Sequence, residues 1–215
     1  MRRNRGRRPP QRRRLAPERP PTEIEPLLVF LNTAERRYPF SKGHRVERDV
    51  LRSREDLERW LAGQDIVPAG TELSGEEHRR TLALRDSLLT LVQTDSPAPP
   101  EALRHLRELG KTVQLQVRFD DHGSPDLEAF GTGLDAALGR WLEVFVSAHL
   151  DGRWRFVKRC EGCLRIFYAT KTKTKYCRTR CGDRVRSRRR KTPRKRWPSA
   201  AKPRAKRSVP DEGRR

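Results

Sequence analysis

The sequence of 215 residues predicts a mainly α-helical domain with a small β-hairpin, followed by a compact four-cysteine module and flanked by basic disordered tails. Three observations lead to this prediction. Helix-start signals precede apolar residues at a helical period, one segment alternates strictly between apolar and polar residues, and all four cysteines fall within residues 160–181. The expected boundaries are a basic arm over 1–25, the helical domain over 26–153, the cysteine module over 154–192 and a basic tail over 193–215.

Two helix starts are chemically explicit. Ser53-x-x-Asp56 and Ser74-x-x-Glu77 both have the form of a capping box, in which the two side chains satisfy free amides at the first turn. The first of these helices is expected to end at Gly63, and the second before Pro97.

Two more helices complete the helical domain. Pro99-Pro100 is typical of a third start, and Gly110 of its end. A last helix is expected over about 132–149. It would turn a stripe of apolar side chains toward the core, namely Leu134, Leu138, Trp141, Leu142, Phe145 and Val146.

A strand is expected over residues 112–119, because apolar and polar residues alternate there. One face would carry Val113, Leu115, Val117 and Phe119. Residues 121–125 have the composition of a turn, and Leu127 and Phe130 are candidates for a partner strand. The sequence therefore predicts a hairpin that packs against the helices, and residues 154–157 are expected to lead in extended form to Cys160.

The four cysteines are spaced as Cys160-x2-Cys163, thirteen residues, and Cys177-x3-Cys181. Two close pairs at this distance supply four thiolates for a tetrahedral ion, and Zn²⁺ accepts such a set with no position left open for a substrate. One structural zinc ion is therefore predicted. Two disulfides in a secreted domain are the alternative. The N-terminus has arginines and prolines where an export signal needs an apolar segment of about 7–15 residues, which favours a cytoplasmic chain with reduced thiols.

The net charge of +22 is unevenly distributed. Residues 1–20 sum to +8, residues 21–152 to −7 and residues 153–207 to +21. A zinc tetrathiolate carries a charge of about −2, so the thiolates explain little of this basic excess. A polyanionic partner, most simply nucleic acid, explains it better, because each Lys or Arg near a phosphate releases counterions. A merely solvated tail is the alternative.

A membrane is not an expected partner. No segment approaches the roughly 20 apolar residues of a membrane span, and the C-terminal segment lacks the Trp, Phe and Leu face of an interfacial helix. Residues 1–25 and 193–215 cannot bury enough apolar surface to fold alone and are expected to be disordered.

Catalytic patterns are missing from the sequence. The five histidines are scattered without metal spacing, and no Ser/His/Asp or Gly-rich phosphate signature is present, so an enzyme is not expected. Asn32 and Thr33 interrupt an apolar run and are expected to form a turn or helix cap. With Arg85 they are also candidates for a small-molecule site, although Arg85 alone could make an ordinary ion pair.

These motifs resemble a known bacterial family. Cys160-x2-Cys163-x3-Phe167 and the segment from Lys175 through Cys177-x3-Cys181-Gly182-Asp183-Arg184 resemble the CGNR-type zinc finger. The upstream domain is similar to the ABATE domain in Phe30-Leu31-Asn32-Thr33 and Leu84-Arg85, and the resemblance covers about residues 26–191. Asp183 departs from the family, which has Asn here. That position either contacts phosphate or base, where a carboxylate would repel, or has a structural role that Asp can also fill.

The resemblance implies a stress-induced transcription regulator with a treble-clef-like finger. Phe167 would pack beneath the zinc, and Cys177 and Cys181 would lie at the start of a basic helix. Candidate nucleic-acid-binding residues are Lys175, Arg178, Arg180, Arg184, Arg186, Arg188, Arg189, Arg190 and Lys191. The preferred hypothesis is a transcription regulator that binds double-stranded DNA in the cytoplasm, at the nucleoid. The helical domain would be its sensor or homodimerisation module. An RNA-binding or ribosome-associated protein and a zinc-stabilised protein-interaction module are the alternatives.

Overall fold

The computed structural model describes residues 20–37, 46–93 and 99–191. The arm over 1–19 and the tail over 193–215, both expected to be disordered, lie outside these residues. The described helices are α1 (Glu25–Leu31), α2 (Arg54–Gly63), α3 (Gly75–Gln93), α4 (Pro100–Thr112), α5 (Gly133–Leu150), the 3-10 helix η1 (Arg153–Phe156) and α6 (Thr179–Lys191). The strands are β1 (Arg36–Arg37), β2 (Val46–Glu47), β3 (Gln114–Phe119), β4 (Pro125–Phe130), β5 (Val157–Arg159) and β6 (Ile166–Tyr168), and they form three separate antiparallel pairs.

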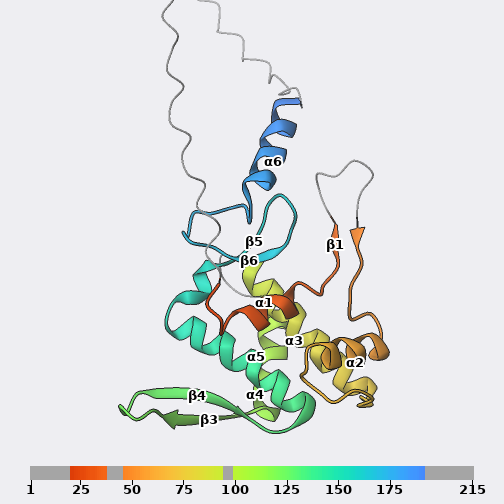
Figure 1. Cartoon of the computed structure of the whole chain (residues 1–215), viewed down its shortest axis with the longest axis vertical. Helices are drawn as coiled ribbons and strands as arrows, with labels where there is room; N and C mark the ends of the chain where they lie inside the picture. Colours follow the sequence, from red (N-terminus) through yellow and green to blue (C-terminus); the bar gives the residue numbers. More distant parts are fainter. Residues whose placement is uncertain (1–19, 38–45, 94–98, 192–215) are drawn as a thin grey trace, which may run out of the picture.

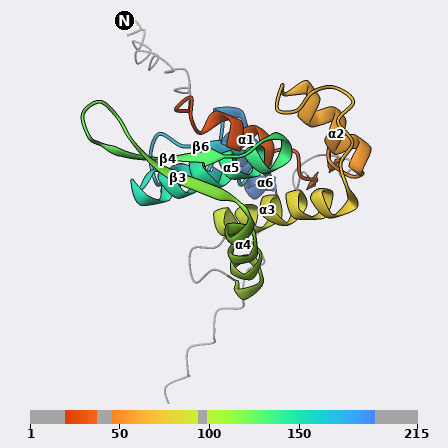
Figure 2. The same cartoon turned by 90° about the horizontal axis from the view of Figure 1, so that it is seen from below.

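Helices α1 to α5 form one body, and the finger, here residues 154–191, lies at one end of it (Figure 1). The hairpin of β3 and β4 extends from the opposite end (Figure 1), and the view from below shows the hairpin against α5 (Figure 2). The mainly α fold with a small hairpin and a four-cysteine cluster is the predicted fold class. None of the described helices combines the length and the apolar composition that a membrane span needs.

Both capping boxes are present. The Ser53 hydroxyl accepts a hydrogen bond from the Asp56 amide at 3.2 Å, and the Ser53 amide donates to the Asp56 carboxylate at 3.3 Å. Ser74 and Glu77 make the same reciprocal pair at the start of α3, at 3.1 and 2.6 Å. These local bonds satisfy orphan amides, which explains why α2 and α3 begin where the sequence predicts.

Helix α1 begins at the last residue of the expected basic arm. Ile24 is its N-cap and is 1 % exposed, and Glu25 is its first residue, so the structured chain begins before the expected end of the arm. The apolar run packs inward, and Asn32 caps the C-terminus of the helix, as the turn-or-cap prediction requires. A helix of seven residues is marginal alone, and burial of its apolar face stabilises it.

The predicted hairpin forms, with two corrections. Helix α4 continues through Gly110 to Thr112, so β3 begins two residues later than expected. The predicted face is also only half covered. The base of the hairpin packs against α5, whereas Val117 and Phe119 toward the tip are 59 % and 68 % exposed. The register pairs Val117 with Leu127 and Phe119 with Pro125, so this apolar face continues across both strands.

One apolar core extends from the helical domain into the finger. Phe30 of α1 stacks on Trp141 of α5, with ring centroids 3.8 Å apart. Val157 of β5 and Ile166 of β6 belong to the same buried cluster. The prediction of extended backbone over 154–157 is wrong for its first three residues, because they lie in η1 and the strand begins at Val157. The finger therefore packs as part of the body.

Candidate metal centre and basic helix

The first cysteine pair lies in a turn between β5 and β6. Cys160 is buried, its amide donates to the Arg165 carbonyl at 2.9 Å, and its carbonyl accepts from the Leu164 amide at 2.8 Å. Leu164 has a φ of 60°, in the left-handed region. This tight reversal turns both sulfur atoms toward the same side, in the knuckle form expected for a C-x2-C pair.

The second pair lies at the start of α6. Cys177 comes two residues before the helix, and Cys181 is in its first turn, where its amide donates to the Arg178 carbonyl at 3.0 Å. The Glu161 amide donates to the Lys175 carbonyl at 3.0 Å, which joins the preceding loop to the knuckle. The basic helix therefore begins at the metal centre, as predicted.

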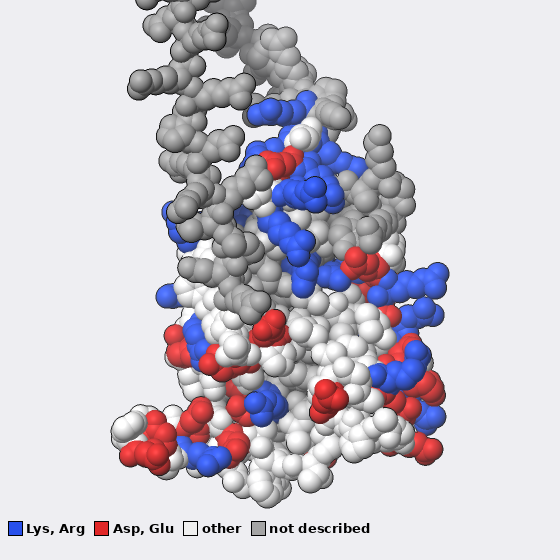
Figure 3. All heavy atoms as spheres, viewed as in Figure 1, with Lys and Arg blue, Asp and Glu red and all other residues white. Residues whose placement is uncertain are grey.

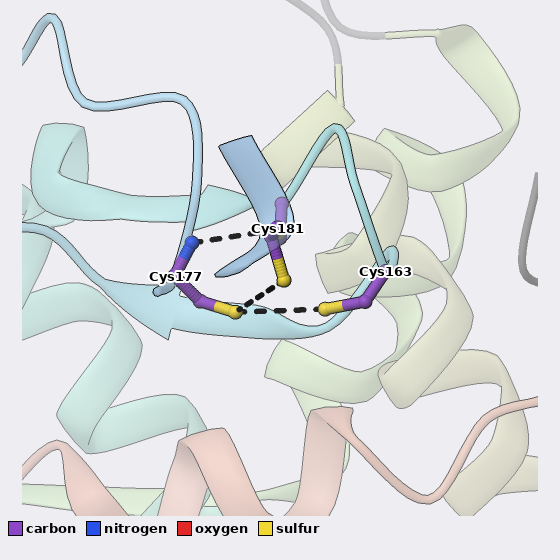
Figure 4. Close-up of side chains that lie close together, drawn as sticks. Cys163, Cys177 and Cys181 are labelled. Carbon is purple, nitrogen blue, oxygen red and sulfur yellow. Dashed lines mark hydrogen bonds between the residues drawn. The ribbon is translucent and has the colours of Figure 1, made fainter. Parts of the chain in front are cut away.

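The four sulfur atoms have the spacing of a tetrahedral site. All four lie within 4.8 Å of one another. The sulfur atoms of Cys163 and Cys177 are 3.5 Å apart and those of Cys177 and Cys181 are 3.8 Å apart, and these three cysteines are drawn in Figure 4. A tetrahedron of sulfurs around Zn²⁺ has edges of about 3.8 Å, for Zn–S bonds of about 2.3 Å. All four cysteines are free thiols. The cluster therefore fits one four-coordinate metal ion and leaves no ligand position open.

The electrostatics of the cluster require a cation when all four thiols ionise. Hydrogen bonds from Cys163 and Cys177 lower the pKa of the Cys160 thiol. The hydrogen bond with Cys160 raises the pKa of Cys177, and burial together with the Cys160 charge raises the pKa of Cys181 to about 11. One thiolate thus suppresses ionisation of its neighbours, and a divalent ion would remove that repulsion.

Two glycines shape this centre: Gly182, which belongs to the motif that resembles the CGNR-type finger, and Gly162, which the sequence reasoning did not single out. A Cβ atom on Gly162 would lie 2.8 Å from the Cβ of Cys181, closer than real Cβ contacts. A Cβ atom on Gly182 would lie 3.1 Å from Cδ2 of Tyr176. The signal that could have identified Gly162 is its position inside the first cysteine pair.

The predicted basic residues are not equivalent. Arg178, Arg180, Arg184 and Arg190 are exposed and make no ion pair with any described residue. Lys175 pairs with Glu161 at 3.1 Å, and Arg186 pairs with Asp183 at 2.7 Å. Arg188 is half-buried and has a partner, while Arg189 and Lys191 belong to the last turns of α6.

Basic side chains gather at the finger end of the molecule. Lys and Arg cover the upper part of the view in Figure 3, over α6 and the loops of the finger, whereas most Asp and Glu lie over the helices and hairpin below. Val185 is buried on the inner side of α6, and Arg180 and Arg184, four residues apart, share its outer side. The helix thus presents a basic face away from the body.

The polar residues of the helical domain are held by internal partners. Arg85 is 3 % exposed. Its guanidinium donates two hydrogen bonds to the Asp49 carboxylate, at 2.8 and 2.7 Å, and its Nε donates to Asp86 at 3.0 Å. Burial alone would lower the pKa of Arg85, but hydrogen bonding and charge pairing with the two carboxylates raise it overall. Thr33 accepts from Arg85 at 3.3 Å and donates to the Phe30 carbonyl at 2.7 Å. This arrangement favours a structural role over a small-molecule site.

Asn32 points the other way, to the finger. Its Nδ2 donates to the carbonyls of Leu28 and Ile166 at 2.7 and 2.9 Å, and its Oδ1 accepts from the Ile166 amide at 3.0 Å. Arg36 makes the fourth bond of this side chain, donating to Oδ1 at 3.1 Å. The structure therefore separates Asn32 from the cluster of Thr33 and Arg85.

The fold and the site define a helical protein that carries a four-cysteine metal-binding finger. Residues 25–148 match the ABATE family, described as "Putative stress-induced transcription regulator". This match covers more than half of the chain, so the protein belongs to the ABATE family. The cysteines clustered at 160–181 are those expected for a CGNR-type zinc finger. None of the curated proteins is significantly similar to the chain.

Proposed function

We propose that the protein is a zinc-dependent DNA-binding transcription regulator in which α6 is the DNA-contacting helix. One observation carries the proposal. The outer side of α6 holds exposed arginines without carboxylate partners among the described residues, directly beside the four-cysteine cluster. By contrast Arg59, Arg79 and Arg118 of the helical domain each pair with a carboxylate. Unpaired guanidinium groups are available for phosphates and base edges.

The dimensions of α6 suit this role. Thirteen residues give a helix of about 20 Å, which can enter the major groove of B-DNA. The helix leads away from the body in Figure 1, so its outer side is open. In this proposal the zinc ion is structural: the four thiolates hold the first turn of α6 at a fixed angle to the knuckle, and no catalytic role is assigned to it.

The other segments have supporting roles in the proposal. The basic arm and the basic tail would add sequence-independent phosphate contacts, which raise affinity more than specificity. The helical domain would act as a sensor or as a homodimerisation module. A regulator of this kind would work in the cytoplasm, at the nucleoid.

The test is binding of the zinc-loaded protein to a randomised pool of duplex DNA over a salt series. Arg180→Ala combined with Arg184→Ala removes the outer charges of α6, and Arg79→Ala combined with Arg118→Ala removes the same net charge from the helical domain. A second comparison uses Cys177→Ser with Cys181→Ser, which removes two metal ligands.

The proposal expects enrichment of a defined DNA site, lost in the α6 and cysteine variants and kept in the helical-domain variant. Salt-sensitive binding that is uniform across DNA sequences and retained by all variants would assign the affinity to the basic arm and tail. It would refute the role of α6. Displacement of duplex DNA by structured RNA at equal concentration would favour the RNA-binding alternative.

A further inference from the structure

Asn32 joins two parts of the chain that are 134 residues apart in sequence. It follows the last residue of α1, and its side-chain amide lies against the backbone of Ile166 at the start of β6. Nδ2 donates to the Ile166 carbonyl at 2.9 Å, and the Ile166 amide donates to Oδ1 at 3.0 Å. A carboxamide is a copy of a peptide group, so these two bonds reproduce one step of a β-ladder.

The register of the finger hairpin explains why Ile166 accepts this partner. Cys160 donates to Arg165, and Ala169 donates to Phe156, so residues 165 and 169 use their backbone groups toward β5. Ile166 faces Arg159 in a pair without such bonds, and its N–H and C=O therefore point away from β5. Ile166 is 3 % exposed, so water cannot readily replace Asn32 as the partner of these two groups.

This contact lies next to the metal ligands. Arg165, the neighbour of Ile166, accepts the amide of Cys160, and Ile166 follows Cys163 by three residues. A shift of β6 would therefore move both ends of the knuckle. The position of Ile166 relative to α1 fixes where the first two sulfur atoms lie.

A second polar link between the finger and the helical domain is more exposed. Arg159 of β5 donates to Gln93 of α3 at the surface. In the Asn32–Ile166 pair, by contrast, Ile166 is almost fully buried, and Asn32 is held by two further bonds: it donates to the Leu28 carbonyl and accepts from Arg36. A buried, doubly bonded contact transmits a change of position better than a single hydrogen bond at the solvated surface.

We infer that Asn32 is a positioning residue that couples metal occupancy of the four-cysteine site to the structure of the helical domain. It holds β6 so that the knuckle is preformed for the metal, and metal binding in turn stabilises the end of α1. Thermodynamic linkage requires the two effects to be equal in size. The inference rests on the zinc site of the proposed function, and it is independent of DNA binding.

The first measurement is zinc affinity, determined by competition with a chromogenic chelator. Asn32→Ala leaves the two buried backbone groups of Ile166 unpaired, and its affinity should fall on the order of tenfold to a hundredfold, as for other residues that orient metal ligands. Ser53→Ala is the matched control, because it removes the cap of α2 and lowers the stability of the helical domain without touching the finger. It should keep the wild-type zinc affinity.

The second measurement is hydrogen exchange with and without zinc. Zinc should slow exchange of the amides of residues 28–33 in the wild type and in Ser53→Ala. Asn32→Ala should lose this zinc-dependent protection while retaining protection in α3 and α5. A residue that merely adds stability would not remove the zinc dependence, so this readout separates positioning from general stabilisation.

Asn32→Asp is a second variant and replaces Asn32→Ala if the latter does not fold. It keeps an acceptor for the Ile166 amide but places a carboxylate oxygen against the carbonyls of Leu28 and Ile166, so a loss of zinc affinity is again expected. Wild-type zinc affinity in the Asn32 variants, or zinc-independent exchange at residues 28–33 in the wild type, would overturn the coupling and leave the zinc site intact. Failure of the wild type to bind zinc would overturn both.

Discussion

Gly162 lies directly against Cys181, so closely that a Cβ atom on Gly162 would be 2.8 Å from the Cβ and 3.0 Å from the carbonyl oxygen of Cys181. The knuckle and the first turn of α6 therefore meet backbone to backbone. Because the atoms of Cys181 that would be struck include main-chain atoms, no side-chain rotation can relieve the overlap. The absence of a side chain at residue 162 is what lets the two cysteine pairs approach within bonding distance of one ion.

Gly162→Ala should weaken metal binding by pushing α6 away from the knuckle. The expected result is at least a tenfold loss of Co²⁺ affinity together with altered charge-transfer bands, because the tetrahedron of sulfur atoms would be distorted. Visible absorption during Co²⁺ titration, followed by displacement with Zn²⁺, measures both quantities.

Gly110→Ala is the control: this residue lies inside α4 with nothing within 4 Å of an added Cβ, and the change should stabilise the protein by about 0.5–1 kcal/mol. Unchanged Co²⁺ spectra in Gly162→Ala would mean that the chain relaxes there freely.

Arg85→Ala should destabilise the helical domain strongly. The substitution leaves Asp49 without its two guanidinium bonds and Thr33 without a donor, in a site where Arg85 is 3 % exposed. Removing one member of a buried pair costs about 3–5 kcal/mol, and the partial exposure of Asp49 places the expected loss near 3 kcal/mol. Urea unfolding measures it. Arg79→Ala, which removes an exposed pair with Glu76, should change stability by less than about 0.5 kcal/mol. A similarly small effect of Arg85→Ala would reopen a binding role for this arginine.

The sequence was informative where structure depends on neighbouring residues. The boxes of Ser53 with Asp56 and of Ser74 with Glu77 involve atoms three residues apart, and both helices begin as predicted. Alternation similarly predicted the strand pair of β3 and β4. The cysteine spacing predicted the cluster, because two tight turns at that separation can bring four sulfur atoms together.

Distant partners were beyond the reach of these patterns. Helix α1 is short and is held by burial against α5, and the sequence reasoning did not use Glu25 and Pro26 in its first turn as a start signal. Asp49, the partner of Arg85, lies in a loop 36 residues away. The contact of Asn32 with Ile166 depends on which way β6 faces. The hairpin shows another limit of sequence patterns. Alternation predicted which of its residues share a face, but it did not predict that half of this face is exposed.

Acid should remove the contribution of the Glu77 capping bond. The hydrogen bond from the Ser74 amide lowers the pKa of Glu77 below its ordinary value of 4.5. The folded state therefore binds this proton less tightly than the unfolded state, so the stabilisation is present above about pH 4.5 and is lost as the pH falls through the folded-state pKa. Glu77→Ala should cost about 1 kcal/mol at pH 7 and less at pH 3.

Urea unfolding of the metal-free, reduced protein at the two pH values tests this, since metal release then cannot contribute. Glu76→Ala removes a neighbouring carboxylate from the same turn and controls for net charge. A cost of Glu77→Ala that is equal at pH 3 and pH 7 would contradict the assigned bond.

Asp183→Asn should strengthen binding to nucleic acid, if α6 contacts phosphates as proposed. Asp183 stands where the finger family has Asn, and in this structure its carboxylate holds Arg186 at 2.7 Å on the exposed surface of the helix. The substitution frees one guanidinium and removes one negative charge, so the plot of log affinity against log salt concentration should become steeper by about 1. Glu128→Gln breaks the comparable exposed pair with Arg118 on the hairpin, changes the net charge equally and should leave the slope unchanged. A weaker complex for Asp183→Asn, with zinc affinity intact, would instead mean that the pairing of Asp183 and Arg186 orients the arginine for its contact.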